Sequence, residues 1–530
     1  MIFKSPFPDV EIPDVPVTSH VLRRVDELAD RTALIDAASG QTLSFGELRS
    51  AIRRTAGGLA ARGFGTGDVL AIYSPNTLSY PIAFHGAAHA GGIITTANPM
   101  YMPSELTDQL RDSGARFLVT VEHFLANARK AAELAGGIEE IFTFDGAEGT
   151  TPFAELMTAE EVEKEPDVDP AEDLVALPYS SGTTGVSKGV MLTHRNLVAN
   201  MVQIKGTERW TRSITEDATL VAVLPFFHIY GMGVIMNYAL SRGARVVVHS
   251  HFDLEEFLAS IEEHGITFAH VVPPILLALA KDPRVDDYDL SSLELINSGA
   301  APLGEDLARA VEERIGCTVG QGYGLTETSP VTHHAATERP ERTPHASIGP
   351  VLPNTEIRIV DVHTGEPVGP GERGELWIRG PQVMAGYLNQ PEATTEAVDD
   401  EGWFHTGDIG YVDEEGDYFI VDRLKELIKF KGFQVAPAEL EDVLLTHPGI
   451  RDAAVVRSPD EEAGEVPKAF IVSDGSLSEE DVMEYVAERV APHKKIRRVE
   501  FIDSIPRSRS GKILRRILID REMEAAEKAS

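Results

Sequence analysis

The sequence predicts an α/β protein with a large N-terminal domain of two doubly wound αβ sheets plus a small β-barrel, followed by a small mobile α+β C-terminal domain. A chain of 530 residues exceeds what one hydrophobic core organises, so several structural units are expected. Over roughly the first 340 residues, short apolar runs alternate with helical patterns, which favours parallel sheets. Beyond them the pattern changes twice, first to short strands between turns and then to a compact mixed segment.

A few local signals mark the elements of the large domain. Ser44-Phe45-Gly46-Glu47 is a capping box that starts a helix. Pro81–Ala90 and Asp253–Glu263 predict two more helices, the second ending near Gly265. Short apolar runs predict strands at Val69–Tyr73, Ile93–Ile94, Phe117–Thr120, Leu174–Tyr179, Leu220–Leu224, Val246–Val248 and Phe268–Val272. In such sheets, ligands bind at the carboxyl ends of the strands.

The C-terminal third divides near residue 421. We assign the N-terminal domain to residues 1–421, a hinge to 422–424 and a C-terminal lid domain to 425–530. The β-barrel part covers about 345–421, where Gly- and Pro-rich turns separate short runs. These runs predict strands at Glu356–Val360, Glu375–Arg379 and Tyr418–Val421 in the barrel and at Ala453–Val456 and Ala469–Val472 in the lid. A helix is expected after Ser478.

The composition narrows the class of protein. A formal net charge of −36 disfavours binding to nucleic acid or to an anionic membrane, and it means that an anionic ligand needs a local positive site. The single cysteine, Cys317, excludes an internal disulfide and is expected in the core. The sequence contains no apolar run typical of a signal peptide or a transmembrane helix, and no peroxisomal address at its end. We therefore expect a cytoplasmic enzyme, either a monomer or a homodimer.

The most informative stretch follows the strand predicted at Leu174–Tyr179 and reads Ser180-Ser181-Gly182-Thr183-Thr184-Gly185-Val186-Ser187-Lys188-Gly189. Glycines let a backbone bend and approach a ligand closely. Backbone N–H groups, hydroxyls and an ammonium together suit a polyphosphate. The spacing is neither that of a P-loop nor that of a GxGxxG dinucleotide loop. The stretch therefore predicts a phosphate-binding loop of another kind.

A second motif is Gln321-Gly322-Tyr323-Gly324-Leu325-Thr326-Glu327-Thr328. Gly322 and Gly324 would let the end of a strand approach a flat ligand, and the ring of Tyr323 could stack on a purine. Thr326 supplies a hydroxyl for a phosphate, and Glu327 supplies a carboxylate for a hard cation. The motif is thus suited to a nucleotide with its metal ion.

Three more motifs follow. Gly402-Trp403-Phe404-His405-Thr406-Gly407-Asp408 offers Asp408 as an acceptor for both hydroxyls of a ribose. Val421–Val435 contains Asp422, Arg423 and several lysines. Pro506-Arg507-Ser508-Arg509-Ser510-Gly511-Lys512 places a lysine in a Pro-, Ser- and Gly-rich loop.

In combination these motifs resemble the adenylate-forming superfamily of acyl-CoA synthetases, luciferases and adenylation domains, and they are most similar to its 4-coumarate–CoA ligase branch. The resemblance covers nearly the whole chain and includes Val271–Ile275, Asn297–Gly304, Pro330-Val331 and Val421–Val435. The chain departs from the pattern at three places. Ser187 replaces the usual proline, Thr332-His333-His334 replaces apolar residues of the plant enzymes, and His251 replaces their lysine.

The resemblance implies an ATP-dependent acid–CoA ligase in which the acid and ATP give an acyl-adenylate and pyrophosphate, and CoA then displaces AMP. It implies a catalytic role for Lys512, with His228, Lys429 and Gln434. The nucleotide-binding residues would be Ser180, Ser181, Gly182, Thr183, Thr184, Gly185, Lys188, Gln321, Gly322, Tyr323, Thr326, Asp408 and Arg423. Glu327 would hold Mg²⁺, Lys431 and Gly432 would line the CoA channel, and Asp422 would be the hinge residue. ATP, Mg²⁺ and CoA are thus the expected cofactors and co-substrates.

The chemistry supports a catalytic lysine on its own terms. When a carboxylate attacks the α-phosphorus of ATP, two anions approach each other, so a cation is needed between them. Lys512 can bridge the carboxylate and the α-phosphate while Mg²⁺ neutralises the remaining charge. A lid that rotates about Asp422 would present Lys512 in the first step and the Lys431 face in the second, and its closure would exclude water.

The identity of the acid is left open by the sequence. Leu224–Gly231 carries His228 and Tyr230 but no acidic residue to pair with a substrate ammonium, which disfavours an amino acid. The expected substrate pocket comprises His228, Tyr230, Pro274, Ala300, Ala301, Gly322, Gly324, Pro330, Val331 and His334. A hydroxycinnamate, a benzoate or a medium- or long-chain fatty acid would fit, since apolar pockets discriminate weakly among similar groups.

Other activities remain alternatives at this point. A luciferase-like monooxygenase would share the fold and the adenylation step, a stand-alone adenylation module would load a carrier protein, and a nucleotide sensor would bind without reacting. A regulatory hypothesis is that a lysine acetyltransferase acts on Lys512, because Pro506 and Gly511-Lys512 fit the pattern around acetylated lysines of related synthetases. Acetylation would remove the charge on which the first step depends.

Overall fold

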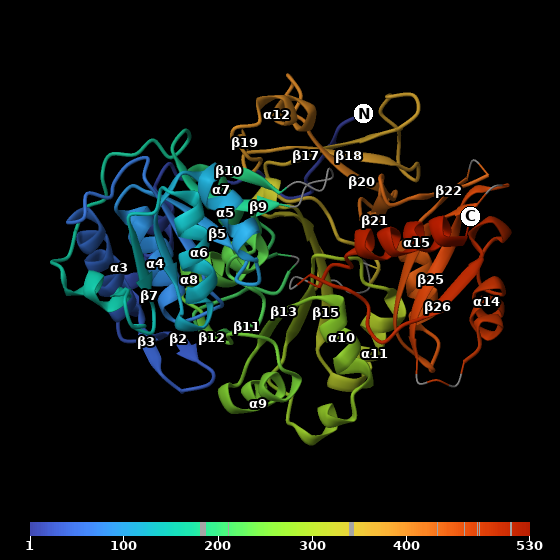
Figure 1. Ribbon diagram of the computed structural model, residues 1–530, viewed down its shortest axis with the longest axis horizontal. Coiled ribbons are helices and arrows are strands. Elements are labelled where there is room, and N and C mark those ends of the chain that lie inside the picture. The colour runs from blue at the N-terminus through green and yellow to red at the C-terminus, as the bar shows by residue number, and fades with distance from the viewer. Residues whose placement is uncertain are drawn as a thin grey trace.

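The computed structural model describes residues 1–180, 187–209, 211–338, 344–431, 433–460, 462–473, 475, 477–508 and 511–529. Three sheets build the N-terminal domain and a fourth builds the lid (Figure 1). The lid lies at one end of the molecule, and its helices and strands are drawn in orange to red. The large α/β domain predicted from the sequence, with a smaller α+β domain after it, is confirmed.

The first sheet consists of β4 (Val69–Tyr73), β5 (Ile93–Ala97), β6 (Ala115–Thr120), β7 (Glu140–Thr143), β8 (Thr151–Pro152), β9 (Leu174–Ser180), β10 (Lys188–Thr193) and β19 (Gly386–Tyr387). Its strand order is β19-β10-β9-β5-β4-β6-β7-β8. The strands from β9 to β8 pair in parallel, as the alternating pattern predicted, while β10 returns antiparallel to β9. Lys188 pairs with Ser180 across that hairpin, so both described ends of the phosphate-loop motif lie side by side.

The second sheet consists of β2 (Thr32–Asp36), β3 (Thr42–Ser44), β11 (Thr219–Ala222), β12 (Arg245–Val248), β13 (Phe268–Val271), β14 (Leu295–Ser298), β15 (Thr318–Gly324) and β16 (Val331–His334). Its order is β16-β15-β14-β13-β11-β12-β2-β3. β13, β14 and β15 run parallel, and the motif Gln321–Thr328 begins in the last four residues of β15 and continues beyond its end. The carboxyl edge of this sheet is therefore where the chemistry-bearing residues collect, as the rule for doubly wound sheets requires.

The helices of this domain are α1 (Val17–Val21), α2 (Val25–Leu28), α3 (Phe45–Ala60), α4 (Ser79–His89), α5 (Pro103–Ser113), α6 (Leu125–Ala135), α7 (His194–Gly206), a π-helix η3 (Gly231–Tyr238), α8 (Ala239–Arg242), α9 (Leu254–His264), α10 (Pro273–Lys281), α11 (Glu305–Ile315) and α12 (Pro391–Ala397). The capping box at Ser44 is confirmed, because Ser44 Oγ accepts from Glu47 N and Glu47 Oε2 accepts from Ser44 N. Helix α4 is buried from Tyr80 to His89, which explains why its sequence has no polar face. Apolar residues of both eight-stranded sheets belong to one continuous core.

The third sheet is antiparallel and has the order β1-β17-β18-β20-β21. It joins β1 (Phe3–Lys4) to β17 (Glu356–Val360), β18 (Gly374–Arg379), β20 (Phe404–Val412) and β21 (Tyr418–Arg423). The β-rich character of 345–421 is as predicted, but the described strands form an open order with β1 and β21 at its edges rather than a closed barrel. The first residues of the chain supply one of those edges, which no local pattern indicated.

The lid contains β22 (Ile428–Phe430), β23 (Phe433–Val435), α13 (Pro437–Leu445), β24 (Ile450–Asp460), β25 (Gly464–Ser473), α14 (Glu479–Ala487), β26 (Arg498–Phe501) and α15 (Arg515–Ala529). Its sheet order is β23-β22-β25-β24, with β26 on β25, and it has its own hydrophobic core. Residues 422–424, where the sequence predicted a hinge, include the last two residues of β21. Asp422 is buried there, and its Oδ2 accepts from Ala438 N in the first turn of α13, which fastens the lid helix to the body sheet.

Candidate active site

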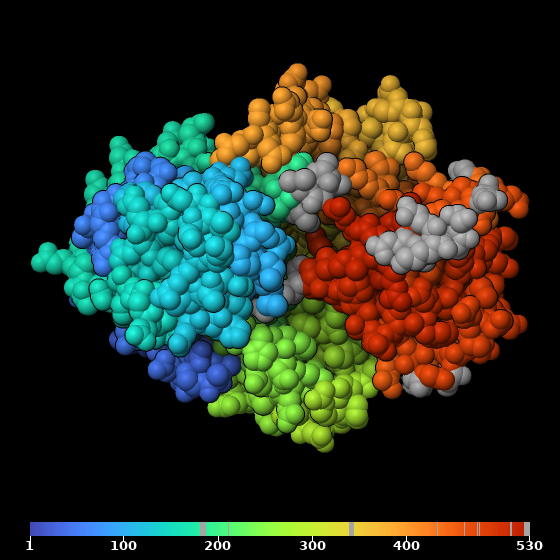
Figure 2. Space-filling view, viewed as in Figure 1, coloured from blue at the N-terminus to red at the C-terminus, as the bar shows by residue number. Residues whose placement is uncertain are grey.

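A large cavity lies between the lid and the carboxyl edge of the second sheet. It encloses about 900 Å³ of empty space, counting the part that opens to solvent, which is within the range of sites that bind small molecules. The space-filling view shows the lid at one side of the molecule, next to the orange and green parts of the N-terminal domain (Figure 2). Of the residues that the sequence predicted for the site, the cavity is lined by His228, Tyr230, Ala300, Gly322, Tyr323, Gly324, Thr326, Pro330, Val331, His334 and Lys512.

Lys512 reaches this cavity from the lid. Gly511, just before it, has φ +79, and a Cβ added there would come within 2.8 Å of Val272 in the N-terminal domain. The glycine therefore allows the lysine loop to approach the body closely. Burial lowers the pKa of Lys512 and Arg423 adds to that effect, whereas Asp408 and Glu327 oppose it. Its side chain keeps accessible surface because it projects into the open cavity, yet protein groups of both signs surround it.

Asp408 belongs to a cluster of polar side chains near Lys512. Its carboxylate is buried, accepts from the hydroxyl of Tyr323 at 2.6 Å and pairs with Arg423 Nε at 3.2 Å. Three motifs from separate parts of the sequence meet here, since Asp408 is on β20, Arg423 on β21 and Tyr323 on β15. Asp408 and Arg423 are direct partners across two antiparallel strands. The sequence predicted all three residues as nucleotide-binding but not that they bond to each other.

A second polar group surrounds Glu327. Its Oε1 accepts from Ser180 Oγ at 2.8 Å and from Tyr387 Oη at 3.0 Å, and the side chain is buried. Lys188 Nζ lies over the ring of Tyr387 at 4.7 Å from its centroid. The predicted metal ligand, Glu327, thus lies at the base of the predicted phosphate loop. Tyr387 connects the two but was not predicted, because an isolated tyrosine far along the chain carries no signal of its own.

His228 lines the cavity beside Lys512. Its Nδ1 accepts from Tyr230 N at 3.3 Å, which assigns the proton of the neutral ring to Nε2. Burial, with a smaller effect of Lys512, lowers the pKa of His228 to about 3. The ring is therefore a neutral hydrogen-bond donor at ordinary pH. Gly231, which follows, is required because a Cβ there would lie 2.1 Å from the carbonyl oxygen of Pro225.

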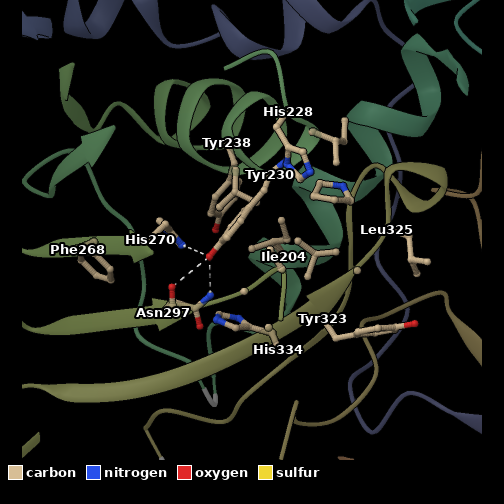
Figure 3. A pocket seen from close by; sticks show the side chains of 18 of the residues that line it. Ile204, His228, Tyr230, Tyr238, Phe268, His270, Asn297, Tyr323, Leu325 and His334 are labelled. Carbon is tan, nitrogen blue, oxygen red and sulfur yellow. Dashed lines mark hydrogen bonds between the residues drawn. The ribbon is translucent and has the colours of Figure 1, made fainter. Parts of the chain in front are cut away.

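The deeper part of the cavity holds a hydrogen-bonded cluster (Figure 3). Tyr230 Oη lies 3.2 Å from His270 Nδ1 and 3.2 Å from Asn297 O, and Asn297 Nδ2 donates to it at 3.3 Å. Burial lowers the pKa of His270 to about 3, so this ring is also neutral. Three buried polar atoms around the cluster have no hydrogen-bond partner among the described residues: His270 Nε2, Asn297 Oδ1 and His334 Nδ1. Such atoms are costly unless a ligand satisfies them.

Two residues predicted for the pocket do not line it. Pro274 is the second residue of helix α10, where a proline is tolerated because its missing N–H needs no partner in the first turn. Ala301 follows Ala300, which lines the cavity, but Ala301 itself is not part of the lining. Residues that line the cavity but were not predicted are Ile204, Thr211, Arg212, Ile214, Ile229, Val234, Tyr238, Phe268, His270, Leu295, Asn297, Gly299 and Leu325. Most lie in ordinary apolar runs, from which sequence alone cannot distinguish core from pocket.

The remaining predicted residues lie elsewhere. Gln321 is buried and hydrogen-bonds Leu303 and the carbonyl of His345, so it supports the strand end. Lys429 and Gln434 are exposed and pair across the β22–β23 hairpin, and Lys431 at its tip pairs with Glu462 at 2.6 Å. These three do not line the cavity. Ser181, Gly182, Thr183, Thr184, Gly185 and Gly432 lie outside the described residues.

The chain belongs to the AMP-binding enzyme family, whose main domain it matches over residues 21–388 and whose C-terminal domain it matches over residues 439–512. The 4-coumarate–CoA ligase of Pinus taeda is 44% identical over 526 residues, which cover 98% of this chain and 97% of that protein. The chain is accordingly an ATP-dependent, AMP-forming acid–CoA ligase of the 4-coumarate–CoA ligase type.

Solved structures agree with this fold. ATP-bound MatB from Rhodopseudomonas palustris superposes with a TM-score of 0.86 at 29% identity, covering 96% of this chain and 99% of that one. Apo MatB from the same organism, with the same coverage, gives only 0.77. Among the helices that the structure describes, none has the length and apolar character needed to cross a membrane.

Proposed function

We propose that this ligase activates a planar aromatic acid with a polar ring substituent, a hydroxycinnamate being the best fit, and transfers it to CoA. The observation that supports this proposal is the Tyr230–His270–Asn297 cluster in the deep part of the cavity that Lys512 and His228 line. The two ends of the substrate would then meet different chemistry. The carboxylate meets an ammonium and a neutral imidazole, and the ring meets hydrogen-bonding groups set among apolar walls.

In the first step, an oxygen of the acid's carboxylate attacks the α-phosphorus of ATP, the bond to the bridging oxygen breaks, and pyrophosphate leaves. Both reactants are anionic, so their approach needs positive charge. Lys512 supplies it from the lid, and Arg423, which is bonded to Asp408, supplies it from the body. Asp408 accepts the ribose hydroxyls, in place of or beside its bond from Tyr323, and the Tyr323 ring offers a face to the purine.

His228 helps to hold the carbonyl oxygen of the acid. Because Nδ1 accepts from Tyr230 N, the N–H of Nε2 is the free donor of the ring. The low pKa of about 3 keeps it neutral, so it orients the carboxylate without adding a second positive charge beside Lys512. The positions of Lys512 and His228 on different domains mean that the complete set of donors forms only when the lid is seated.

Mg²⁺ would be held at Glu327. The carboxylate is buried, both of its hydrogen bonds that the structure shows end on Oε1, and Ser180 at the start of the phosphate loop is one of the donors. Among the described residues no cluster of three His, Cys, Asp or Glu side chains forms a metal site. A single carboxylate is the donor set expected for an ion that takes its other ligands from phosphates and water. Bound there, the ion would supply charge neutralisation for the phosphates.

In the second step, the sulfur of CoA attacks the acyl carbon and AMP leaves. Lys429, Lys431 and Gln434 would serve this step after the lid has rotated about Asp422, bringing the exposed β22–β23 hairpin to the cavity in place of Lys512. Their exposure and their distance from the cavity lining in the present pose are what this proposal requires. The two-step use of one lid separates a step that needs a cation from a step that needs an open path for a thiol.

A medium-chain fatty acid is the second candidate. The cavity continues past the Tyr230 cluster to Ile214, Phe268 and Leu295, which form an apolar end. An aliphatic chain would fill that end, but it would leave the unpartnered atoms of His270 and Asn297 against methylene groups, which costs free energy. The hydroxyl of a phenolic ring can bond to these atoms, which is why we prefer the aromatic acid.

Acetylation of Lys512 is a further part of the proposal, and it depends on the pose of the lid. In the seated pose the ammonium projects into the cavity, so an acetyltransferase would need the rotated lid. Mass spectrometry of the native protein tests it directly. Absence of an acetyl group at Lys512, or full adenylation activity of an acetylated sample, would remove the idea.

The test of the acid is a panel of 4-coumarate, cinnamate, benzoate and C6–C16 fatty acids, with AMP release measured with and without CoA. We expect kcat/KM to be highest for 4-coumarate, and the Tyr230→Phe variant to reduce the advantage of 4-coumarate over cinnamate. One lost hydrogen bond corresponds to about tenfold, at roughly 1.4 kcal/mol per factor of ten. A fatty acid that outperforms every aromatic acid would replace the proposal, and the same preference in wild type and Tyr230→Phe would exclude the cluster as its cause.

A further inference from the structure

We infer that Arg507 and Arg515 are positioning residues that fasten the two ends of the Lys512 loop to the lid, so that the lid delivers the ammonium as part of a rigid body. The inference rests on the proposed role of Lys512 in adenylation. It assigns function to two arginines that do not line the cavity and do not contact the reacting groups.

Local backbone hydrogen bonds join the two described sides of the Lys512 loop. Leu514 N donates to Pro506 O at 2.8 Å and Ser508 N donates to Lys512 O at 2.8 Å. These bonds hold the two described sides of the loop together, but they do not fix where the loop stands relative to the rest of the lid. A lysine side chain rotates about four bonds, and its ammonium lacks the fixed planar donor geometry of a guanidinium. Its backbone must therefore be held if the ammonium is to be placed accurately.

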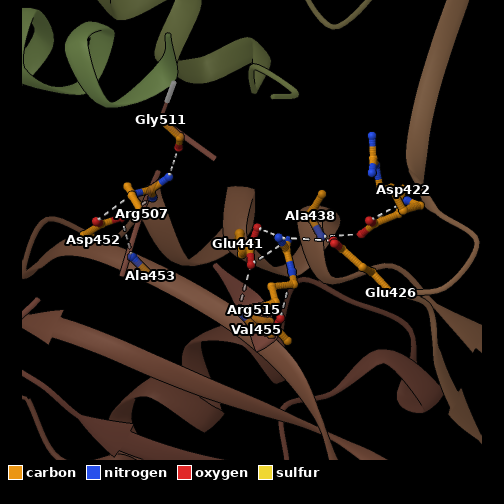
Figure 4. Close-up of polar contacts among 11 residues, drawn as sticks. Asp422, Glu426, Ala438, Glu441, Asp452, Ala453, Val455, Arg507, Gly511 and Arg515 are labelled. Carbon is orange, nitrogen blue, oxygen red and sulfur yellow. Dashed lines mark hydrogen bonds and ion pairs between the residues drawn. The ribbon is translucent and has the colours of Figure 1, made fainter. Parts of the chain in front are cut away.

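Arg507 holds the first end of the loop (Figure 4). Its Nη2 and Nε pair with the carboxylate of Asp452 at 2.8 and 3.3 Å, and its Nη1 donates to the carbonyl oxygen of Gly511 at 2.9 Å. Asp452 is itself fixed on β24, because its Oδ1 accepts from Ala453 N. One guanidinium therefore bonds both to β24, a long strand of the lid sheet, and to the residue directly before Lys512.

Arg515 holds the second end, three residues after Lys512. Its Nη2 bonds to both oxygens of Glu441 on α13 at 2.9 and 2.7 Å, and its Nε donates to Val455 O on β24 at 3.3 Å. Its Nη1 pairs with Glu426, which follows the hinge, at 3.4 Å. Burial opposes the charge of Arg515, but the nearby carboxylates of Glu441, Glu426 and the hinge residue Asp422 raise its pKa. Arg515 thus connects the lysine loop to the lid core and to the chain that leaves the hinge.

The alternative is that the two arginines only stabilise the lid. Either role predicts a lower melting temperature when the bonds are lost. Only the positioning role predicts a loss confined to the step that uses Lys512, because a misplacement of about 1 Å at a reacting group can cost on the order of a hundredfold in rate. The two half-reactions of the enzyme therefore provide the readout, since the second one proceeds without Lys512 in the cavity.

The experiment compares Arg507→Ala, Arg507→Lys and Asp452→Asn with two references in the full-length protein. Lys512→Ala sets the size of the effect, and Arg521→Gln is the matched control, because Arg521 lies on the same helix as Arg515 but is exposed, where it pairs with Glu500 and lies over the ring of Phe470, away from the Lys512 loop. Acyl-adenylate formation is followed by pyrophosphate release, thioester formation is followed from supplied acyl-adenylate and CoA, and the melting temperature is recorded for each.

We expect Arg507→Ala and Asp452→Asn to lower kcat of adenylation by about tenfold or more while KM for ATP and acid and the rate of thioester formation change by less than about twofold. Arg507→Lys should recover part of the loss, because it keeps one donor. Arg515→Lys should show the same division between the two half-reactions. If it does not fold, Glu426→Gln removes a partly exposed partner of Arg515 and serves in its place.

Equal losses in both half-reactions, a rise in KM with unchanged kcat, or no loss at all in the Arg507 and Asp452 variants would overturn the inference. If Lys512→Ala loses adenylation while the Arg507 and Asp452 variants keep it, the positioning role of the arginines is wrong but the proposed role of Lys512 stands. If Lys512→Ala itself keeps full adenylation, the proposed role of Lys512 fails and the inference falls with it.

Discussion

Gly511 offers the sharpest test of the seated lid, because a methyl group added to this lid residue would press against Val272 of the N-terminal domain. Gly511 has φ +79, and a Cβ at this position would lie 2.8 Å from Val272 Cγ2 and 2.9 Å from Val272 Cβ. Real side chains do not approach so closely, so in Gly511→Ala either the loop or β13 and the residue after it must shift.

The free-energy cost of Gly511→Ala has two parts. The left-handed conformation costs an alanine about 1–2 kcal/mol, and this cost is paid in either pose of the lid because it belongs to the loop itself. The contact with Val272 arises only when the lid is seated, and overpacking of this kind typically costs about 1–3 kcal/mol. At roughly 1.36 kcal/mol per factor of ten, the pose-specific part lowers adenylation by about 5- to 150-fold.

The assay is single-turnover formation of acyl-adenylate, compared with thioester formation from supplied acyl-adenylate. Gly511→Ala should lower the first far more than the second. Val272→Ala removes the contact at 2.8 Å but leaves the one at 2.9 Å, so the double variant should recover part of the lost rate. The reasoning is refuted if both half-reactions fall equally, or if Val272→Ala restores nothing.

Three further outcomes follow from the site. Asp408→Ala should raise KM for ATP strongly and leave KM for the acid nearly unchanged in initial-rate kinetics, since its buried carboxylate pairs with Arg423 on the nucleotide side; a larger change in KM for the acid would contradict the assignment. Glu327→Gln should raise the Mg²⁺ concentration that gives half the maximal adenylation rate, measured by metal titration at constant ATP. An unchanged midpoint would count against Glu327 as the metal ligand. Asp442 faces Gly304, Asp306, Glu439 and Glu441 at the contact of lid and body, and burial followed by these like charges raises its pKa to about 7. With the lid seated, the Asp442 carboxyl keeps its proton up to about pH 7, whereas in an open lid it would lose that proton near its ordinary pKa of about 4. The equilibrium between the two poses should therefore shift away from the seated lid as pH rises from about 4 to about 7 and stay level above that. Asp442→Asn should flatten this pH dependence of the adenylation rate, and an unaltered pH profile would show that the lid contact is insensitive to Asp442.

Much of the fold could be predicted because its signals are local. The capping box at Ser44, the strand Val69–Tyr73 and the helix that ends at Gly265 each appear where the pattern placed them. The position of β1 could not be predicted, since two residues at the start of the chain pair with a strand more than 350 positions later. The open order of the third sheet has the same cause, because pairing between distant strands leaves no periodicity in the sequence.

The sequence by itself determined the class of chemistry, because a phosphate loop, a ribose acceptor and a late lysine are short motifs whose residue types have to be present for the reaction to occur. The tertiary structure alone decided which side chains meet: His270 and Asn297 around Tyr230 in the cavity, Tyr387 between Glu327 and Lys188, and Asp452 and Glu441 against the arginines beside the lysine loop. Each of these pairs residues that are far apart in the chain or hidden in ordinary apolar runs. Their proximity depends on how sheets and lid pack in three dimensions, which no local pattern of residues records.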